Sequence, residues 1–174
     1  MKNAPIDGLA EGPALAAKVE AALASGLATD DPVISEAWVR YVQALRRPVS
    51  AVSFGDPSLK FHVSSPDAIL SRAAAAATPS LAAYVERVSR VNPFYSALRE
   101  AAQKQGKADD PHVLATLDRL RLVPGRGHAI LVDVANAELM MLDDGNVVDR
   151  MKVIVGKPDF QTPLLAGTIN YVTF

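Results

Sequence analysis

Three histidines, three pairs of adjacent acidic residues and one glycine-lysine pair are the residues of this chain with the most direct potential for chemistry. The histidines His62, His112 and His128 share no spacing typical of a metal site, so we expect none of them to bind a metal ion. Capping of helices and formation of turns explain the acidic pairs without any acid–base role. These pairs are Asp30 with Asp31, Asp109 with Asp110, and Asp143 with Asp144.

Gly156 and Lys157 follow an apolar stretch, as the lysine of a phosphate-binding loop would. Met151 stands where such a loop needs its first glycine, and Pro158 follows the lysine, so we expect no phosphate cradle. The chain has no cysteine, which excludes disulfides, cysteine-ligated metals and a thiol nucleophile. No serine-hydrolase motif is present. The residues therefore predict no catalytic, cofactor-binding or metal-binding site and no cofactor.

Two short arginine groups, Arg46–Arg47 and Arg119 with Arg121, lack interleaved aromatic residues. We interpret them as solvated helix faces or as partners of helix C-terminal dipoles. Eighteen basic against nineteen acidic residues give a net charge of -1. This balance provides no electrostatic basis for binding nucleic acid or an anionic membrane surface, so we expect no nucleic-acid partner.

Length and composition indicate a packed globular protein. The chain has 174 residues, of which 49% are hydrophobic and 21% charged, close to the globular average. The residues from Met1 to Asp7 are followed by no apolar stretch typical of a signal peptide. No apolar run approaches the ~18 residues of a membrane span, so we expect no transmembrane segment.

The first two thirds of the chain predict helices. Five residues with capping side chains each precede a proline, an arrangement typical of a helix start. These are Asp31, Ser65, Thr78, Asn92 and Asp110. Apolar residues then recur at helical spacing, which predicts an amphipathic bundle. The expected inward residues are Ile34, Trp38, Tyr41, Val42 and Leu45; Leu81, Tyr84, Val85 and Val88; Phe94, Ala97, Leu98 and Ala101; and Val113, Leu114, Leu117 and Leu120.

On the last of these helices we expect Asp118, Arg119 and Arg121 to point outward. After Gly127 the pattern changes to strands, which we place at 129–134, 139–142, 147–155 and 168–174. Asp144–Gly145 predicts a hairpin turn, and the alternation of Met151, Val153 and Val155 with basic residues predicts one buried face. We therefore expect an α+β fold, with an N-terminal extension or first helix over 1–30, a helical unit over 31–122 and strands over 123–174.

Several stretches, in this order, resemble the large, scaffold-bearing subfamily of L,D-transpeptidases with a YkuD-type catalytic domain. Residues 117–124 are similar to the family's arginine-rich helix end, and residues 130–139 to its "V-N-x-P" strand, with Asp133 and Ala135 departing from that phrase. Residues 151–163 match "M-x-V-x-V-G-K…Q-T-P", the most specific part. Within it we interpret Gln161–Pro163 as a structural turn that ends a strand. Residues 37–47 and 92–99 look like scaffold helices.

The resemblance implies an enzyme of the bacterial cell envelope that acts on peptidoglycan stem peptides in the periplasm of a Gram-negative bacterium. In the family a cysteine thiolate takes the acyl group of a tetrapeptide stem, and an amine of a neighbouring stem resolves the thioester as a 3→3 cross-link. The cysteine motif follows the "Q-T-P" phrase, but this sequence stops at Phe174. We therefore expect a truncated, inactive member whose open C-terminal strand edge promotes self-association. The alternative is a non-catalytic envelope scaffold or a module that binds stem peptides.

Overall fold

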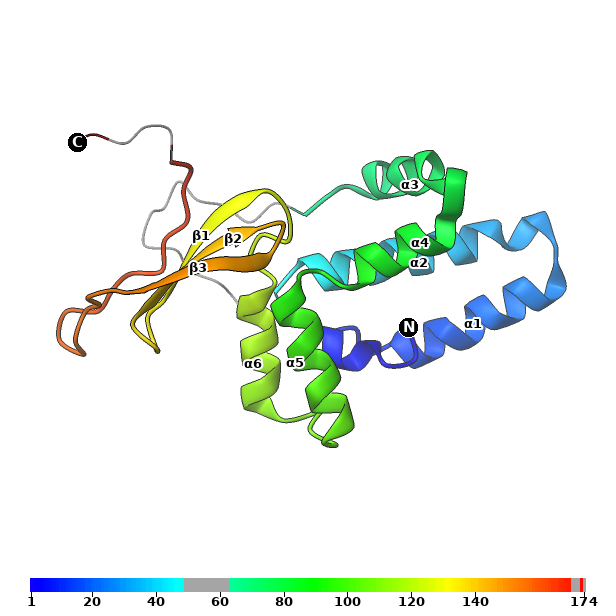
Figure 1. Ribbon diagram of the computed structural model, residues 1–174. Helices are drawn as coiled ribbons and strands as arrows, with labels where there is room; N and C mark the ends of the chain where they lie inside the picture. Colours follow the sequence, from blue (N-terminus) through cyan, green and yellow to red (C-terminus); the bar gives the residue numbers. More distant parts are fainter. Residues whose placement is uncertain (49–62, 170–172, 174) are drawn as a thin grey trace.

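The computed structural model describes residues 1–48, 63–169 and 173 and confirms the α+β class (Figure 1). The α-helices are α1 Gly12–Ser25, α2 Asp31–Arg46, α3 Pro66–Ala75, α4 Ala77–Ser89, α5 Pro93–Lys104 and α6 Pro111–Leu120. Two short 3-10 helices, η1 Ala4–Asp7 and η2 Ala28–Asp30, flank α1. The strands are β1 His128–Asp133, β2 Glu138–Asp143 and β3 Asn146–Lys152.

Three of the five predicted helix starts are confirmed by their caps. The side chains of Ser65, Asn92 and Asp110 each accept a backbone N–H from the first turn of α3, α5 and α6. The other two helices, α2 and α4, also begin at or next to the predicted positions, so both helix starts are confirmed, but their N-cap residues are Asp30 and Ala76. Asp31 is the first residue of α2 and makes no capping bond, because η2 leads directly into the helix. Thr78 lies inside α4, which begins at Ala77, because α3 is followed almost directly by α4.

The helices form two apolar clusters around α2 (Figure 1). The larger cluster joins η1, α1, α2, α5 and α6, and its most deeply buried side chains include Leu45, Tyr95 and Leu117. The smaller cluster joins α2 to α3 through Val42 and Ile69. Residues of η1 are therefore core residues of the helical unit, because Ala4 and Ile6 are buried in the larger cluster.

Three predicted core positions are exposed. Ala97 and Ala101 face solvent on α5, because the buried side of this helix is centred on Tyr95 and Ala102 instead. Leu81 on α4 is 47% exposed, whereas Tyr84, Val85 and Val88 further along the helix are half-buried. The predicted inward residues of α2 and α6 are buried or half-buried.

The three strands form an antiparallel meander in the order β1-β2-β3, as expected. The turn between β2 and β3 is the predicted Asp144–Gly145 pair, and both residues have positive φ, as a tight two-residue hairpin turn requires. Ile130 pairs with Met141, and Val132 with Leu139. The fourth predicted strand is not formed at Thr168 and Ile169, and residues 170–172 and 174 lie outside the described part of the chain.

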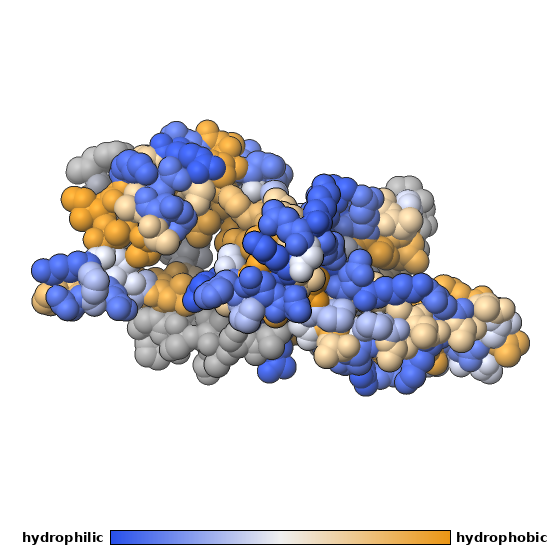
Figure 2. Space-filling model, turned by 90° about the horizontal axis from the view of Figure 1, so that it is seen from below, coloured by the Kyte–Doolittle hydropathy of each residue, from blue (hydrophilic) through white to orange (hydrophobic). Residues whose placement is uncertain are grey.

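The two faces of the sheet differ in exposure. Met140 and Leu142 of β2 are buried on one face, whereas Ile130 and Met141, paired on the other, are 49% and 40% exposed. The prediction for β3 is wrong: Met151 is exposed, and Val153 and Val155 lie beyond the strand, which ends at Lys152. Figure 2 shows hydrophobic surface at the end of the molecule that carries the sheet.

Candidate functional site

The junction between the helical unit and the sheet is built on Asn92. Its Oδ1 caps α5 by accepting the Tyr95 N–H at 2.9 Å, and its Nδ2 donates to the carbonyls of Leu120 and Val123 at 2.7 and 3.1 Å. The side chain is 3% exposed, so all three bonds are shielded from water. One amide therefore joins the start of α5 to the chain that leads from α6 into β1.

Two glycines bring the sheet close to the start of α5. A Cβ on Gly125 would lie 2.4 Å from the carbonyl oxygen of Val91, and a Cβ on Gly145 would lie 2.8 Å from Cδ of Pro93. The hairpin turn is tied to the same region, because the Gly127 N–H donates to Asp144 Oδ1 at 2.8 Å. Only residues without a side chain permit this approach, so the turn and the helix start have one relative placement.

The Gly156–Lys157 pair lies in a closed turn that follows β3. The Gly156 N–H donates to Thr162 Oγ1 at 2.8 Å, and the Phe160 N–H donates to the Lys157 carbonyl at 2.9 Å. A Cβ on Gly156 would come within 2.1 Å of the Phe160 carbonyl oxygen, so the turn requires glycine. The Lys157 ammonium lies 5.5 Å from the centre of the Phe160 ring. The N–H groups of Gly156 and Phe160 are therefore bonded within the turn, and the Lys157 ammonium lies over an aromatic ring.

The other candidate residues are dispersed. His112 begins α6, His128 begins β1 beside Asp143, and His62 lies outside the described residues. Asp110 caps α6 and Asp144 closes the hairpin, which confirms the capping and turn roles of those two pairs. Within 1–48, 63–169 and 173, no three metal-ligating side chains come together.

A buried polar network links η1 to α5. The Asp7 carboxylate is inaccessible to solvent and accepts three bonds, from the Tyr95 hydroxyl at 2.7 Å and from Nε and Nη2 of Arg99 at 2.7 and 2.8 Å. Burial and the neighbouring Asp7 carboxylate raise the pKa of the Tyr95 phenol above its ordinary value. The charge of Asp7 is thus satisfied inside the fold, and the network has the chemistry of an internal clamp.

The network continues to α6 and corrects the prediction for that helix. Asp118 and Arg121, expected to face outward with Arg119, are both 7% exposed and form an ion pair. Arg121 also lies over the Tyr95 ring and donates from Nη2 to its hydroxyl at 3.4 Å. Only Arg119 of the three is exposed. The packing of α6 against α5 buries a face that its sequence pattern alone does not reveal.

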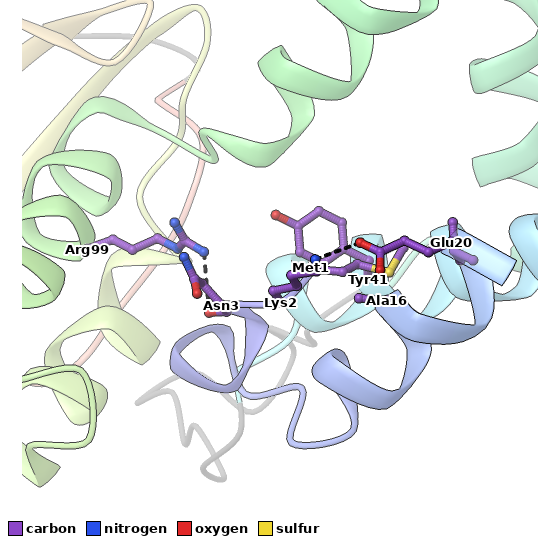
Figure 3. Close-up of a pocket in the computed structure, with 8 residues that line it drawn as sticks. Met1, Lys2, Asn3, Ala16, Glu20, Tyr41 and Arg99 are labelled. Carbon is purple, nitrogen blue, oxygen red and sulfur yellow. Dashed lines mark hydrogen bonds and ion pairs between the residues drawn. The ribbon is translucent and has the colours of Figure 1, made fainter. Parts of the chain in front are cut away.

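An open hollow of about 640 Å³ lies between the N-terminus, α1 and α5 (Figure 3). Lys2 and Glu20 pair across it at 2.7 Å, and Arg99, already bound to Asp7, donates to the Asn3 carbonyl at 3.5 Å. Lys2 and Arg99 are thus each paired with a carboxylate. A second cavity, between α2, α3 and α4, is lined by three arginines and by no acidic residue among its described lining.

Comparison with known families defines the class of the sheet-bearing part. Residues 127–174, which contain all three strands, match the model of the YkuD family, the L,D-transpeptidase catalytic domain. The resemblance to L,D-transpeptidases is thereby confirmed for this segment. No curated protein and no solved structure matches the chain. In the described part of the chain, no helix is both long enough and apolar enough to cross a bilayer.

Proposed function

We propose that this protein functions with the L,D-transpeptidases of peptidoglycan biosynthesis, in the periplasm of a Gram-negative cell, where it contributes to wall organisation and cell shape. This proposal rests on the family match at residues 127–174. The closed Gly156–Thr162 turn supports it, because the family's most specific phrase forms an ordered unit here. Residues 31–122 would be the helical scaffold and 123–174 the N-terminal part of the catalytic domain, preceded by an extension over 1–30.

The reaction of the family requires a thiolate that these 174 residues do not contain. A thiolate would attack the acyl carbon of the tetrapeptide stem, D-alanine would leave, and the amine of a second stem would release the acyl group as a 3→3 cross-link. We infer that the chain by itself is inactive. Incubated with purified stem peptides, it should give no cross-linked product in mass spectrometry.

The coding sequence beyond the codon for Phe174 tests whether this chain is part of a catalytically active protein. A histidine followed by a Ser-His-Gly-Cys-type motif, in frame or displaced by a frameshift, would support it. A stretch that encodes no such motif in any frame would contradict the enzymatic proposal and leave only a binding role. Joining the motif-bearing segment to this chain should then restore cross-linking, and changing its cysteine to alanine should abolish the product.

A second candidate function is a non-catalytic scaffold that binds stem peptides through its helical part. The arginine-lined cavity between α2, α3 and α4 favours it, because stem peptides carry free carboxylates. Binding of stem peptides to the full chain, measured by calorimetry, tests this role. The absence of heat at millimolar peptide would remove it.

We also propose that the chain associates with itself through the sheet. Ile130, Val132, Met141 and Met151 form an exposed apolar surface on one face, and β1 and β3 are edge strands of the sheet in its described part. Exposed apolar surface beside unpaired strand edges favours pairing with another chain. Sedimentation of the wild-type chain and of variants with charges on this face tests the association.

A further inference from the structure

The second cavity has a volume of about 380 Å³ and is bounded by α2, α3, α4 and the end of α6. We call it the arginine pocket. It is lined by Val42, Arg46, Ser64, Ile69, Arg72, Tyr84, Val88 and Arg121. Three cations and no anion are present among these side chains, and because Arg121 is paired with Asp118, the positive charge open to a ligand is that of Arg46 and Arg72.

The two outer arginines of the pocket have no acidic partner among the described residues. Among the described residues, Arg46 donates to the Val88 carbonyl at 3.5 Å, and Arg72 donates to Ser64 Oγ at 3.3 Å. Burial and, after it, the nearby cation Arg126 lower the pKa of Arg46, so Arg126 adds positive charge beside this guanidinium group. Both guanidinium groups therefore retain donors that a ligand can use.

Arg121, which also lines the pocket, is buried. Its side chain is only 1% exposed, and its Nε–H has no hydrogen-bond partner. Asp118 and the Tyr95 hydroxyl receive its other donors. A buried donor without an acceptor is unfavourable, and proteins retain few of them.

The remaining walls are apolar. Ile69 and Val42 are buried in the cluster beneath the pocket, and the half-buried Val88 and Tyr84 flank it. Planar guanidinium groups match the geometry of carboxylate and phosphate oxygens, whereas these walls suit an aliphatic group attached to the anion. The ligand that fits is thus an oxyanion carried on an apolar chain, and not a bare inorganic ion.

We propose that the arginine pocket is a binding site for a short peptide, whose carboxylate contacts Arg46 and Arg72 and whose aliphatic part packs on Tyr84 and Val88. The choice of a peptide, rather than another carrier of an oxyanion, rests on the proposed function. The site lies in the helical unit, on elements outside the segment that matches the catalytic family. A stem peptide bound there would lie outside the segment that matches the catalytic domain.

The experiment titrates the full chain by calorimetry with a synthetic tetrapeptide stem, with the same peptide amidated at its carboxylates, and with inorganic phosphate. We expect the free-acid peptide to bind, and the amide form and phosphate to bind at least ~10-fold more weakly. The variants Arg46→Gln and Arg72→Gln should each weaken peptide binding by roughly 10-fold, as loss of a charge-assisted bond does. Rising salt should weaken wild-type binding, because the outer arginines are solvent-exposed.

The matched control is Arg119→Gln, which removes an exposed arginine of α6 outside the pocket and should leave affinity unchanged. Thermal unfolding of each variant shows whether the fold is intact. Because Arg46 and Arg72 are on the surface, the double variant should fold.

If that double variant bound the peptide with wild-type affinity, the proposal for the arginine pocket would be wrong. Such a result would still show that the protein binds stem peptides at another site. Preferential binding of phosphate, or no binding of the peptide, would also overturn the proposal. The coding-sequence test of the proposed function is independent of all these outcomes.

Discussion

Asp7 and Arg99 form a two-pronged ion pair between η1 and α5, with Nε and Nη2 of the guanidinium 2.7 and 2.8 Å from the two carboxylate oxygens. Asp7 is inaccessible to solvent, whereas the Arg99 side chain is 24% exposed. The pair therefore fixes the N-terminal segment to the helical core from the inside. The Tyr95 hydroxyl adds a third donor to the same carboxylate.

Replacing Asp7 with asparagine should lower the free energy of unfolding by about 2–4 kcal/mol, because Arg99 loses its counter-charge in a largely desolvated place. Urea unfolding followed by circular dichroism measures the change. The control is Glu100→Gln, which breaks the exposed Glu100–Lys104 pair and should leave the midpoint unchanged. Equal midpoints for all three proteins would show that the clamp contributes nothing.

The stability of the protein should fall in alkaline solution because of Tyr95. Burial and Asp7 raise the pKa of the folded phenol, whereas the unfolded phenol ionises near its ordinary pKa of about 10. The contribution is thus complete below pH ~10 and is lost as the pH rises above it. Unfolding free energies of the wild type and Tyr95→Phe, measured from pH 8 to 11.5, should converge at the alkaline end. A difference that stays constant over this range would contradict the assignment.

Asn92 should prove more important than an ordinary helix cap. Asn92→Ala removes the cap and both carbonyl contacts, and should cost about 2–3 kcal/mol. Asn92→Ser restores the capping oxygen but cannot reach Leu120 and Val123, so it should recover only part of the loss. Denaturant unfolding separates the two variants. Full recovery by serine would mean that the junction contacts do not contribute.

Gly125→Ala should loosen the attachment of the sheet to α5, since the new Cβ would lie 2.4 Å from the Val91 carbonyl. We expect a loss of about 1–3 kcal/mol, typical of overpacking, and faster amide exchange in β1 and β2. The matched control is Gly167→Ala, where a Cβ meets nothing within 4 Å. Identical exchange in both variants would contradict the close approach.

Self-association through the sheet should respond to charges on its exposed face. Ile130→Lys and Met141→Lys place like charges on two residues paired across β1 and β2, and should shift sedimentation toward the monomer. Leu81→Lys, at a residue of similar exposure on α4, should leave the wild-type distribution unchanged. A wild-type chain that is monomeric at every concentration would exclude the association.

Local signals in the sequence predicted much of the fold. Ser65, Asn92 and Asp110 were identifiable as caps because the proline that follows each one reinforces the same conformation. The turn at Asp144 and Gly145 was predictable for the same reason, since its positive φ values require such residues. These features depend on neighbours in the sequence, and the structure confirms them.

Features that depend on distant packing were not predictable. The sequence predicted that Asp118 and Arg121 point outward. Their burial depends on where α6 meets α5 and on the hydroxyl of Tyr95, which the sequence pattern does not report. Similarly, the sequence indicated only a solvated helix face or a helix-dipole partner for Arg46 and did not single out Arg72. Their convergence requires α2 and α3 to pack together, and no spacing in the sequence reports that arrangement.

The separation of the clamp residues has a consequence for the timing of folding. Arg99 follows Asp7 by 92 residues, so the carboxylate has no partner until the chain has closed a loop of that length. Until then η1 has no place in the core, and the hairpin of α1 and α2 emerges with an open apolar side. The 3-10 helix η1 is therefore among the last elements of the helical unit to reach its native position.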